Sequence, residues 1–246
     1  MSVLAIVRPY SIVATSGTLT GAPLLATPDP KEAAVATGGG GTIDIDLGAV
    51  QLIDTLFLGY TNAAAGSTAT VRYGTGGPSE QDGGTIAAAE SDAIEPRRHF
   101  LRMFDTPFSA RFLRISGNFA VGTVVGTVAA GRAFRPTYGQ EYGGGRAVTD
   151  TGTVSRLFGG GFSIDEGARA GSWAWTLGDL TGDEVRALYA LQLDRGSSRS
   201  VLVIEDPDAG PGLNERIHWS LFSRLDRYER LDPLNTKWGF QVDDWA

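Results

Sequence analysis

The sequence predicts a mainly β protein built from two β-sandwich domains. Through the first half, short apolar segments recur roughly every ten residues and are separated by Gly, Pro, Ser and Asp, which is typical of antiparallel strands. Only residues 181–194 show the three- and four-residue apolar spacing of a helix. A length of 246 residues fits two domains of about 100–150 residues each. We therefore expect an N-terminal jelly roll and a C-terminal β-sandwich with one helix.

Composition restricts the partners. The chain carries a formal net charge of −7 and no cysteine. Duplex DNA and anionic membranes bind clustered Lys and Arg, so we predict neither nucleic acid binding nor membrane insertion. Without cysteine there are no disulfides or thiolate metal sites, and we predict no cofactor and no metal. The apolar run near the N-terminus is too short for a secretory signal, so we expect a protein made in the cytoplasm.

The strands of the first half are read from alternation and turn residues. Ile43, Ile45 and Leu47 alternate with Asp44 and Asp46, which places the apolar side chains in a core and the carboxylates outside. Five further segments have strand character, at residues 56–60, 68–73, 100–104, 110–116 and 121–129. Many short strands without intervening helices predict an antiparallel sandwich or jelly roll.

A domain boundary is expected near residue 137. There the basic segment 132–136 runs into the glycine-rich segment 138–145. The predicted domains are therefore residues 1–136 and 137–246. All five tryptophans lie in the second domain, so either its core or its assembly surface is aromatic; the residues assigned to this role are Trp173, Trp175, Trp219 and Trp238.

The second half contains a strand-helix-strand unit. Trp173, Trp175 and Leu177 alternate along a strand. Thr181 followed by Glu184 forms a capping box at a helix start, and Gly196 suits the helix end. The apolar run 201–204 predicts a buried strand. The remaining predicted elements are strands at 149–157, 217–222, 227–231 and 238–242, with a turn at 158–162.

Catalytic constellations are scarce in this sequence. The sequence contains only two histidines, His99 and His218, and they fall in different predicted domains. Few residues are therefore available to form a Ser-His-Asp triad. Asp44 and Asp46 share one strand face and could act as paired carboxylates, although a solvated strand shows the same pattern. The loop Asp206–Gly210 lacks the later ligands of a calcium loop and is interpreted as a turn. We therefore predict that the chain is not an enzyme.

Sugar contacts have better candidates. Tyr60 and Asn62 follow a strand end and combine an aromatic ring with an amide, the chemistry that saccharide binding uses. Arg97, Arg98 and His99 lie beside a turn, where we expect His99 at the surface and both arginines able to contact a ligand. A plain loop is the alternative for both segments.

Two resemblances extend this reading. The segments Thr42–Gly48 (TIDIDLG), 52–60 and 110–115 (ARFLRI) resemble the discoidin-type galactose-binding-like jelly roll over about residues 20–135. That family commonly binds carbohydrate, and many members serve as spacers or assembly modules. The segments Trp173–Trp175, 180–184, 188–196 and 201–204 are similar to distal-tail and minor tail proteins of long-tailed bacteriophages, in which this unit belongs to a β-sandwich that assembles as a ring.

These observations give three hypotheses for the function. The first is a structural virion protein of a phage tail tip, which forms a homo-oligomeric ring with itself and contacts other tail proteins. The second is a carbohydrate-binding module that recognises a host surface glycan or serves a polysaccharide-active enzyme. The third is an enzyme that uses the carboxylates named above. Neither the neighbours in an assembly nor the sugar follows from the sequence.

Overall fold

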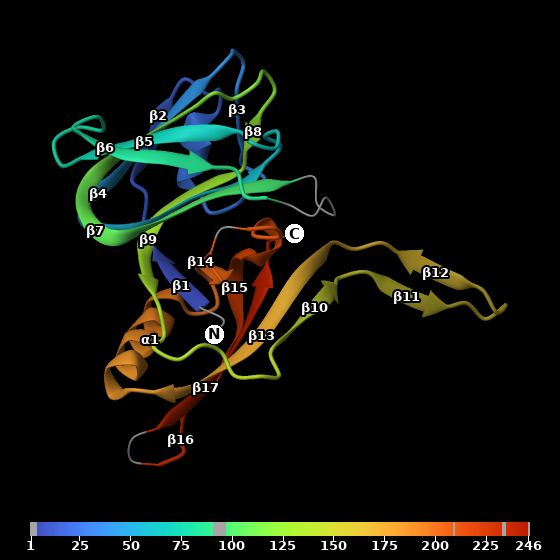
Figure 1. Ribbon diagram of the computed structural model, residues 1–246. Helices are drawn as coiled ribbons and strands as arrows, with labels where there is room; N and C mark the ends of the chain where they lie inside the picture. Colours follow the sequence, from blue (N-terminus) through green and yellow to red (C-terminus); the bar gives the residue numbers. More distant parts are fainter. Residues whose placement is uncertain (1–3, 91–96, 209, 233–234, 246) are drawn as a thin grey trace. The chain divides into compact units, whose positions relative to one another are not determined.

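The computed structural model describes residues 4–90, 97–208, 210–232 and 235–245. Within these residues it is mainly β with one α-helix, which confirms the predicted fold class. The chain divides into two compact units (Figure 1). Unit 2 comprises residues 4–135 and 202–218, and unit 1 comprises the described residues of 136–201 and 219–246.

The division of the chain is less simple than a single boundary near residue 137. The chain passes from unit 2 to unit 1 between Arg135 and Pro136, but residues 202–218 group again with unit 2. The cause is β14 (Val201–Glu205), which pairs antiparallel with β1 (Leu4–Pro9). Residues 201–204 are fully buried, as their apolar run predicts. The run does not reveal which sheet the strand joins.

Unit 2 is an antiparallel β-sandwich. Its other elements are β2 (Ala14–Gly17), the 3-10 helix η1 (Ala22–Ala26), β3 (Ala34–Val35), β4 (Gly41–Thr61), β5 (Thr68–Gly74), β6 (Gln81–Ala87), β7 (Arg98–Gly117), β8 (Val124–Val125), β9 (Thr127–Phe134) and the 3-10 helix η2 (Asn214–Arg216). The strand order is β14-β1-β9-β4-β7-β5-β6, with β2 beside β4 and a separate β3–β8 pair.

Two long strands connect the layers of unit 2. β4 and β7 each join two segments that the sequence predicts as separate strands. The first half of β4 pairs with β2 and its second half with β9, and the register against β7 shifts between Asp46 and Gln51. Such an irregularity lets a strand bend from one layer into the other. Ile43 and Ile45 point into the core, as predicted.

Unit 1 carries the aromatic core. Its strands are β10 (Gly145–Asp150), β11 (Thr153–Arg156), β12 (Phe162–Asp165), β13 (Arg169–Leu180), β15 (Ile217–Leu225), β16 (Glu229–Arg230) and β17 (Thr236–Asp244). The order is β10-β13-β17-β15, with β16 beside β17, while β11 and β12 form a separate two-stranded sheet. Trp173, Trp175, Trp219 and Trp238 are at most 3% exposed. These four tryptophans therefore pack in the interior of the chain and do not form an exposed assembly surface.

The helix α1 (Gly182–Arg195) forms where the sequence predicts it. Thr181 Oγ1 accepts a hydrogen bond from the Glu184 N–H, and the Thr181 N–H donates to the Glu184 carboxylate at 2.8 Å. Leu188 and Leu191 are buried, and Gly196 ends the helix with φ 53°. No helix among the described residues is long and apolar enough to cross a bilayer.

Candidate functional site

The residues predicted for sugar contact come together at one end of unit 2. Tyr60 lies at the end of β4 and Asn62 directly follows that strand, whereas Arg97 precedes β7 and Arg98 and His99 begin it. The two segments are neighbours because Thr61 pairs with Arg98 in the β4–β7 ladder. The Thr61 hydroxyl also donates to the Arg98 carbonyl at 3.0 Å.

Tyr60 is the centre of this cluster. Its φ of 55° lies in the left-handed region, which a tyrosine adopts only where surrounding contacts hold it. Its N–H donates to His99 Nδ1 at 3.2 Å, and its ring meets the His99 ring edge-on at 5.3 Å between centroids. The Arg97 guanidinium lies 5.5 Å from the centre of the tyrosine ring, within cation–π range. The half-exposed Tyr60 ring is thus fixed in place.

His99 corrects the expectation of a surface position. The residue is only 9% exposed, and its ring also packs against Phe57 at 5.3 Å. The reason is that both faces of β7 are covered near its start, where His99 and Phe100 are both buried and only Arg98, at the strand end, is half-exposed. His99 therefore holds Tyr60 from the buried side and does not itself face a ligand at the surface.

Asn62 holds a loop. Its side-chain amide donates to the Gly122 carbonyl at 3.2 Å and accepts from the Val124 N–H at 2.7 Å. Both ends of the amide are occupied within the chain. The residues left to face a ligand are therefore Tyr60, Arg97 and Arg98.

Asn214 is a supporting residue that sequence reasoning misses. It is 4% exposed, its Oδ1 accepts from the His99 N–H at 2.7 Å, and its Nδ2 donates to the Arg97 carbonyl at 3.0 Å. Asn214 thereby fixes the backbone of Arg97 and of His99, the two neighbours of Arg98. No local pattern marks this asparagine, because its partners lie 115 and 117 residues away.

The carboxylates considered as an acid–base pair are engaged elsewhere. Arg114 Nε and Nη2 donate to Asp44 at 2.6 and 2.7 Å, and Arg111 makes the same two contacts with Asp46 at 2.8 and 2.9 Å. The hydrogen bond from Arg111 lowers the pKa of Asp46. Both carboxylates thus act as ion-pair partners between β4 and β7. Among the described residues, no three His, Asp or Glu side chains are placed to share a metal ion.

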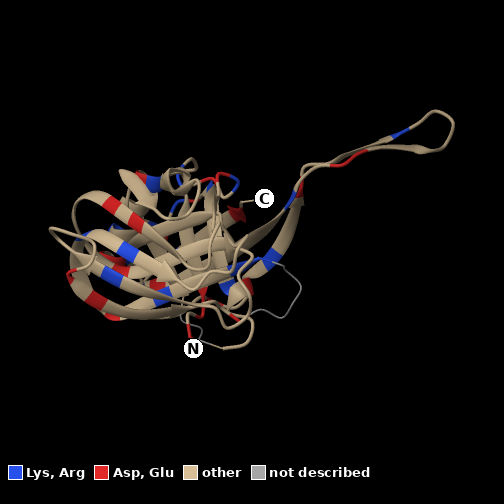
Figure 2. Ribbon diagram, turned by 90° about the horizontal axis from the view of Figure 1, so that it is seen from above, with Lys and Arg blue, Asp and Glu red and all other residues tan. Residues whose placement is uncertain are grey.

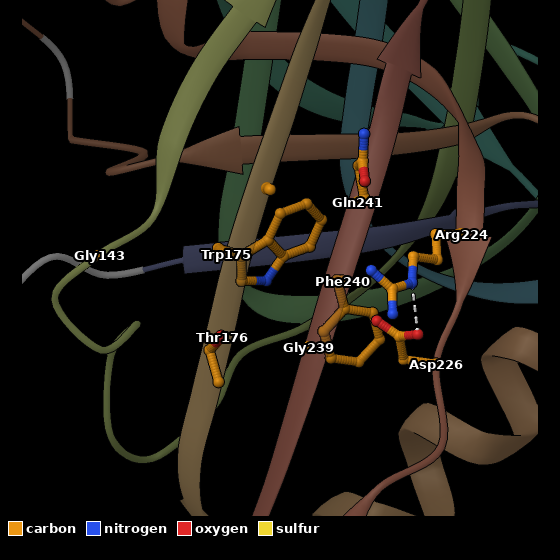
Figure 3. Close-up of a pocket in the computed structure, with 9 residues that line it drawn as sticks. Gly143, Trp175, Thr176, Arg224, Asp226, Gly239, Phe240 and Gln241 are labelled. Carbon is orange, nitrogen blue, oxygen red and sulfur yellow. Dashed lines mark ion pairs between the residues drawn. The ribbon is translucent and has the colours of Figure 1, made fainter.

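A depression with a volume of about 180 Å³ lies on the sheet of unit 1. Figure 3 shows Arg224 and Asp226 joined by an ion pair, with Nε and Oδ1 2.7 Å apart, beside the strands that carry Trp175 and Phe240. The rings of Trp175 and Phe240 stack at 5.5 Å in the interior. Since the arginine and the carboxylate neutralise each other, this depression offers a ligand less than the Tyr60 cluster does.

The resemblance to known proteins extends over about half of the chain. The sequence matches no protein-family model and no curated protein. Among solved structures, a fucose-binding module of Streptococcus pneumoniae aligns with 51% of this chain and 98% of the module, at 12% identity and a TM-score of 0.39. A chitosan-binding module in complex with chitotriose, from a Paenibacillus chitosanase/glucanase, aligns with 50% of this chain and 98% of the module, at 13% identity and a TM-score of 0.36.

A third structure aligns with this chain to a similar extent. A module from a family 31 glycoside hydrolase of Clostridium perfringens aligns with 51% of this chain and 98% of its own length, at 12% identity and a TM-score of 0.37. The three structures are carbohydrate-binding modules by description. At this level of likeness no ligand contact is carried over from them to this chain.

Proposed function

We propose that unit 2 is a carbohydrate-binding module whose site is formed by Tyr60, Arg97 and Arg98. The observation that carries the proposal is the half-exposed Tyr60 ring, which is held rigidly by His99 and has the Arg97 guanidinium over it. A fixed aromatic ring packs against the C–H face of a sugar, and guanidinium N–H groups donate to its hydroxyl or carboxylate oxygens. The resemblance of residues 20–135 to the galactose-binding-like jelly roll supports the same function.

Binding by full-length protein to a glycan array tests this proposal, followed by titration calorimetry with each glycan that binds. The array should hold both neutral and uronate-containing oligosaccharides, because two arginines favour an anionic sugar. We expect the Tyr60→Ala and Arg97→Ala variants to lose at least tenfold in affinity, about 1.4 kcal/mol.

The matched controls are Tyr142→Ala and Arg169→Ala, which remove an exposed tyrosine and an exposed arginine of unit 1. Both should bind like the unchanged protein. If no glycan on the array binds, or if the control variants weaken binding as much as Tyr60→Ala does, the proposed site is wrong.

A second function is favoured by a different feature, the projecting β11–β12 hairpin with its exposed apolar side chains. We propose that the chain is also a structural component of a self-assembling particle, namely the tail tip of a long-tailed phage, made in the host cytoplasm and located in the virion. The resemblance of residues 173–204 to tail proteins supports this assignment. In this setting the jelly roll serves as an outward spacer or as the module that contacts a host glycan.

Two measurements test the second function. Proteomics of purified phage particles should detect the chain at a constant ratio to other tail proteins. Light scattering on the purified full-length chain should give a mass that is a multiple of 25.9 kDa. A strictly monomeric chain that is absent from particles would contradict the assembly role and leave the glycan proposal untouched.

A further inference from the structure

The β11–β12 hairpin is an arm that is exposed on all its residues. β11 (Thr153–Arg156) and β12 (Phe162–Asp165) pair with each other through four register partners, and every residue of both strands is solvent-exposed. The hairpin extends from β10 and β13 through the Thr151 N–H, which donates to the Ala168 carbonyl at 3.0 Å. Figure 1 shows it projecting away from the rest of unit 1.

The arm is two-faced. Val154 pairs with Ile164 and Arg156 pairs with Phe162, so strand alternation places these four side chains on one face. The opposite face carries Thr153, Ser155, Ser163 and Asp165. Two strands alone are marginally stable in water, and this pattern is that of a ribbon with one covered face and one solvated face.

The exposed apolar area is large enough for an interface. Val154, Phe162 and Ile164 are 66%, 62% and 67% exposed, and the tip residues Leu157 and Phe158 are 53% and 112% exposed. With about 200 Å² per aromatic side chain, the two phenylalanines alone present roughly 350 Å², nearly half of the about 800 Å² that each partner buries in a standard interface. Figure 2 shows the tip loop of the arm without charged residues and a basic segment on the strand beside it.

The same chain offers a complementary surface on α1. Leu188 and Leu191 face the core, but Tyr189 and Leu193, which are one helical turn apart, are 51% and 70% exposed. The apolar face of the arm carries one charged side chain, Arg156, which favours approach to another copy of a chain whose net charge is −7. In Figure 1 the arm and α1 lie on opposite sides of unit 1, so one copy cannot cover its own helix.

We propose that the apolar face of the β11–β12 arm docks on the Tyr189–Leu193 strip of α1 in a second copy of this chain. The contact uses two different surfaces and is therefore head-to-tail, which generates a closed ring or an open filament. This inference rests on the assembly role proposed above and names the surfaces that carry it. It is independent of the glycan site.

Cross-linking tests the contact directly, because the chain contains no cysteine. Phe158→Cys protein is mixed with Leu193→Cys protein under mild oxidation. We expect a disulfide-linked pair in the mixture and little in either variant alone. A mixture of Phe158→Cys with Val121→Cys, an exposed apolar position of unit 2, serves as the control. Equal cross-linking in the control mixture or in Phe158→Cys alone would overturn the docking on α1.

Mass measurements separate this inference from the assembly role. A Phe158→Ser/Phe162→Ser variant should fall to the mass of one chain, 25.9 kDa, while a Val13→Ser/Val121→Ser variant keeps the oligomer. If the arm variant remains oligomeric, the arm inference fails and assembly stands. If the unchanged protein is monomeric at every concentration, both fail. Circular dichroism equal to that of the unchanged protein verifies that the arm variant is folded.

Discussion

At the scale of single residues, Asn214 is the side chain on which the candidate site depends most. Replacing it by alanine leaves the His99 N–H and the Arg97 carbonyl without the partners they have now. Each buried polar group without a partner costs about 1–3 kcal/mol. We therefore expect Asn214→Ala to lower the free energy of unfolding by about 2–3 kcal/mol in urea denaturation, and to weaken glycan binding as well.

The Asn214→Asp variant complements this prediction. It keeps an oxygen that accepts from the His99 N–H, but it buries a carboxylate whose second oxygen faces the Arg97 carbonyl. It should therefore be at least as destabilised as the alanine variant at neutral pH and regain stability in acid, where the protonated carboxyl donates to that carbonyl. Equal stability of Asn214→Ala and the unchanged protein would mean that this asparagine does not support the site.

Residue types near strand ends identify candidates for ligand contact, but neither their proximity nor their roles. Tyr60 and Arg97 have suitable chemistry, and only the structure shows that they lie within cation–π range. The sequence indicates a surface position for His99, because its burial depends on what covers the start of β7. Asn214 could not be found at all, since its contacts cross more than one hundred residues of sequence.

At the scale of elements, the N-terminus of α1 tests whether neighbouring residues alone determine where the helix begins. The capping box of Thr181 and Glu184 satisfies two amides at the helix start. Thr181→Ala should lower the free energy of unfolding of unit 1 by about 1 kcal/mol, as measured by thermal or urea denaturation. Thr153→Ala, on the polar face of the arm, is the matched control and should change stability little.

The same cap predicts a pH dependence. Burial raises the pKa of Glu184, but hydrogen bonds from Thr137 and Thr181 lower it more, so the pKa lies below its usual value. A carboxyl whose folded pKa is lowered stabilises the fold above its unfolded pKa, and this contribution is lost as pH falls through the folded value. Glu184→Gln should therefore reduce stability at neutral pH, and the difference from the unchanged protein should disappear well below about pH 4.

Denaturation of both proteins across this acid range is the measurement. A stability difference that stays constant from neutral to strongly acidic pH would show that the charge of Glu184 is not involved.

Short elements with strong local signals were predictable, whereas long bent strands were not. The helix at 181–194 has its own cap, apolar stripe and terminal glycine, and α1 forms at 182–195. In β4, by contrast, two predicted strands are one strand with a bend after Asp46, where Gly48 adopts φ 75°. Turn-forming residues look the same in a bend as in a loop, so only pairing with β7 decides between them.

At the scale of the whole molecule, the unexpected feature is that unit 2 is completed by residues far along the sequence. A linear boundary near residue 137 follows from composition, because local composition cannot show that a strand returns. β14 supplies Leu202, Val203 and Ile204 to the interior beside β1, and all three are fully buried. The isolated segment 1–136 therefore keeps the core cluster of residues 19–130 but leaves β1 with an open strand edge.

The dependence of the segment 1–136 on β14 can be tested by producing the segment with and without that strand. Alone, it should aggregate or unfold at lower urea concentration than the full-length chain, because the backbone groups of β1 that pair with β14 become an exposed edge. Attaching residues 202–218 through a flexible glycine-serine linker should restore solubility, cooperative unfolding and any glycan binding. A linker of equal length that carries a shuffled 202–218 sequence is the control. If the segment 1–136 alone unfolds as cooperatively and at the same urea concentration as the linked protein, then β14 and Asn214 are dispensable for unit 2, and the boundary read from composition is the physical one.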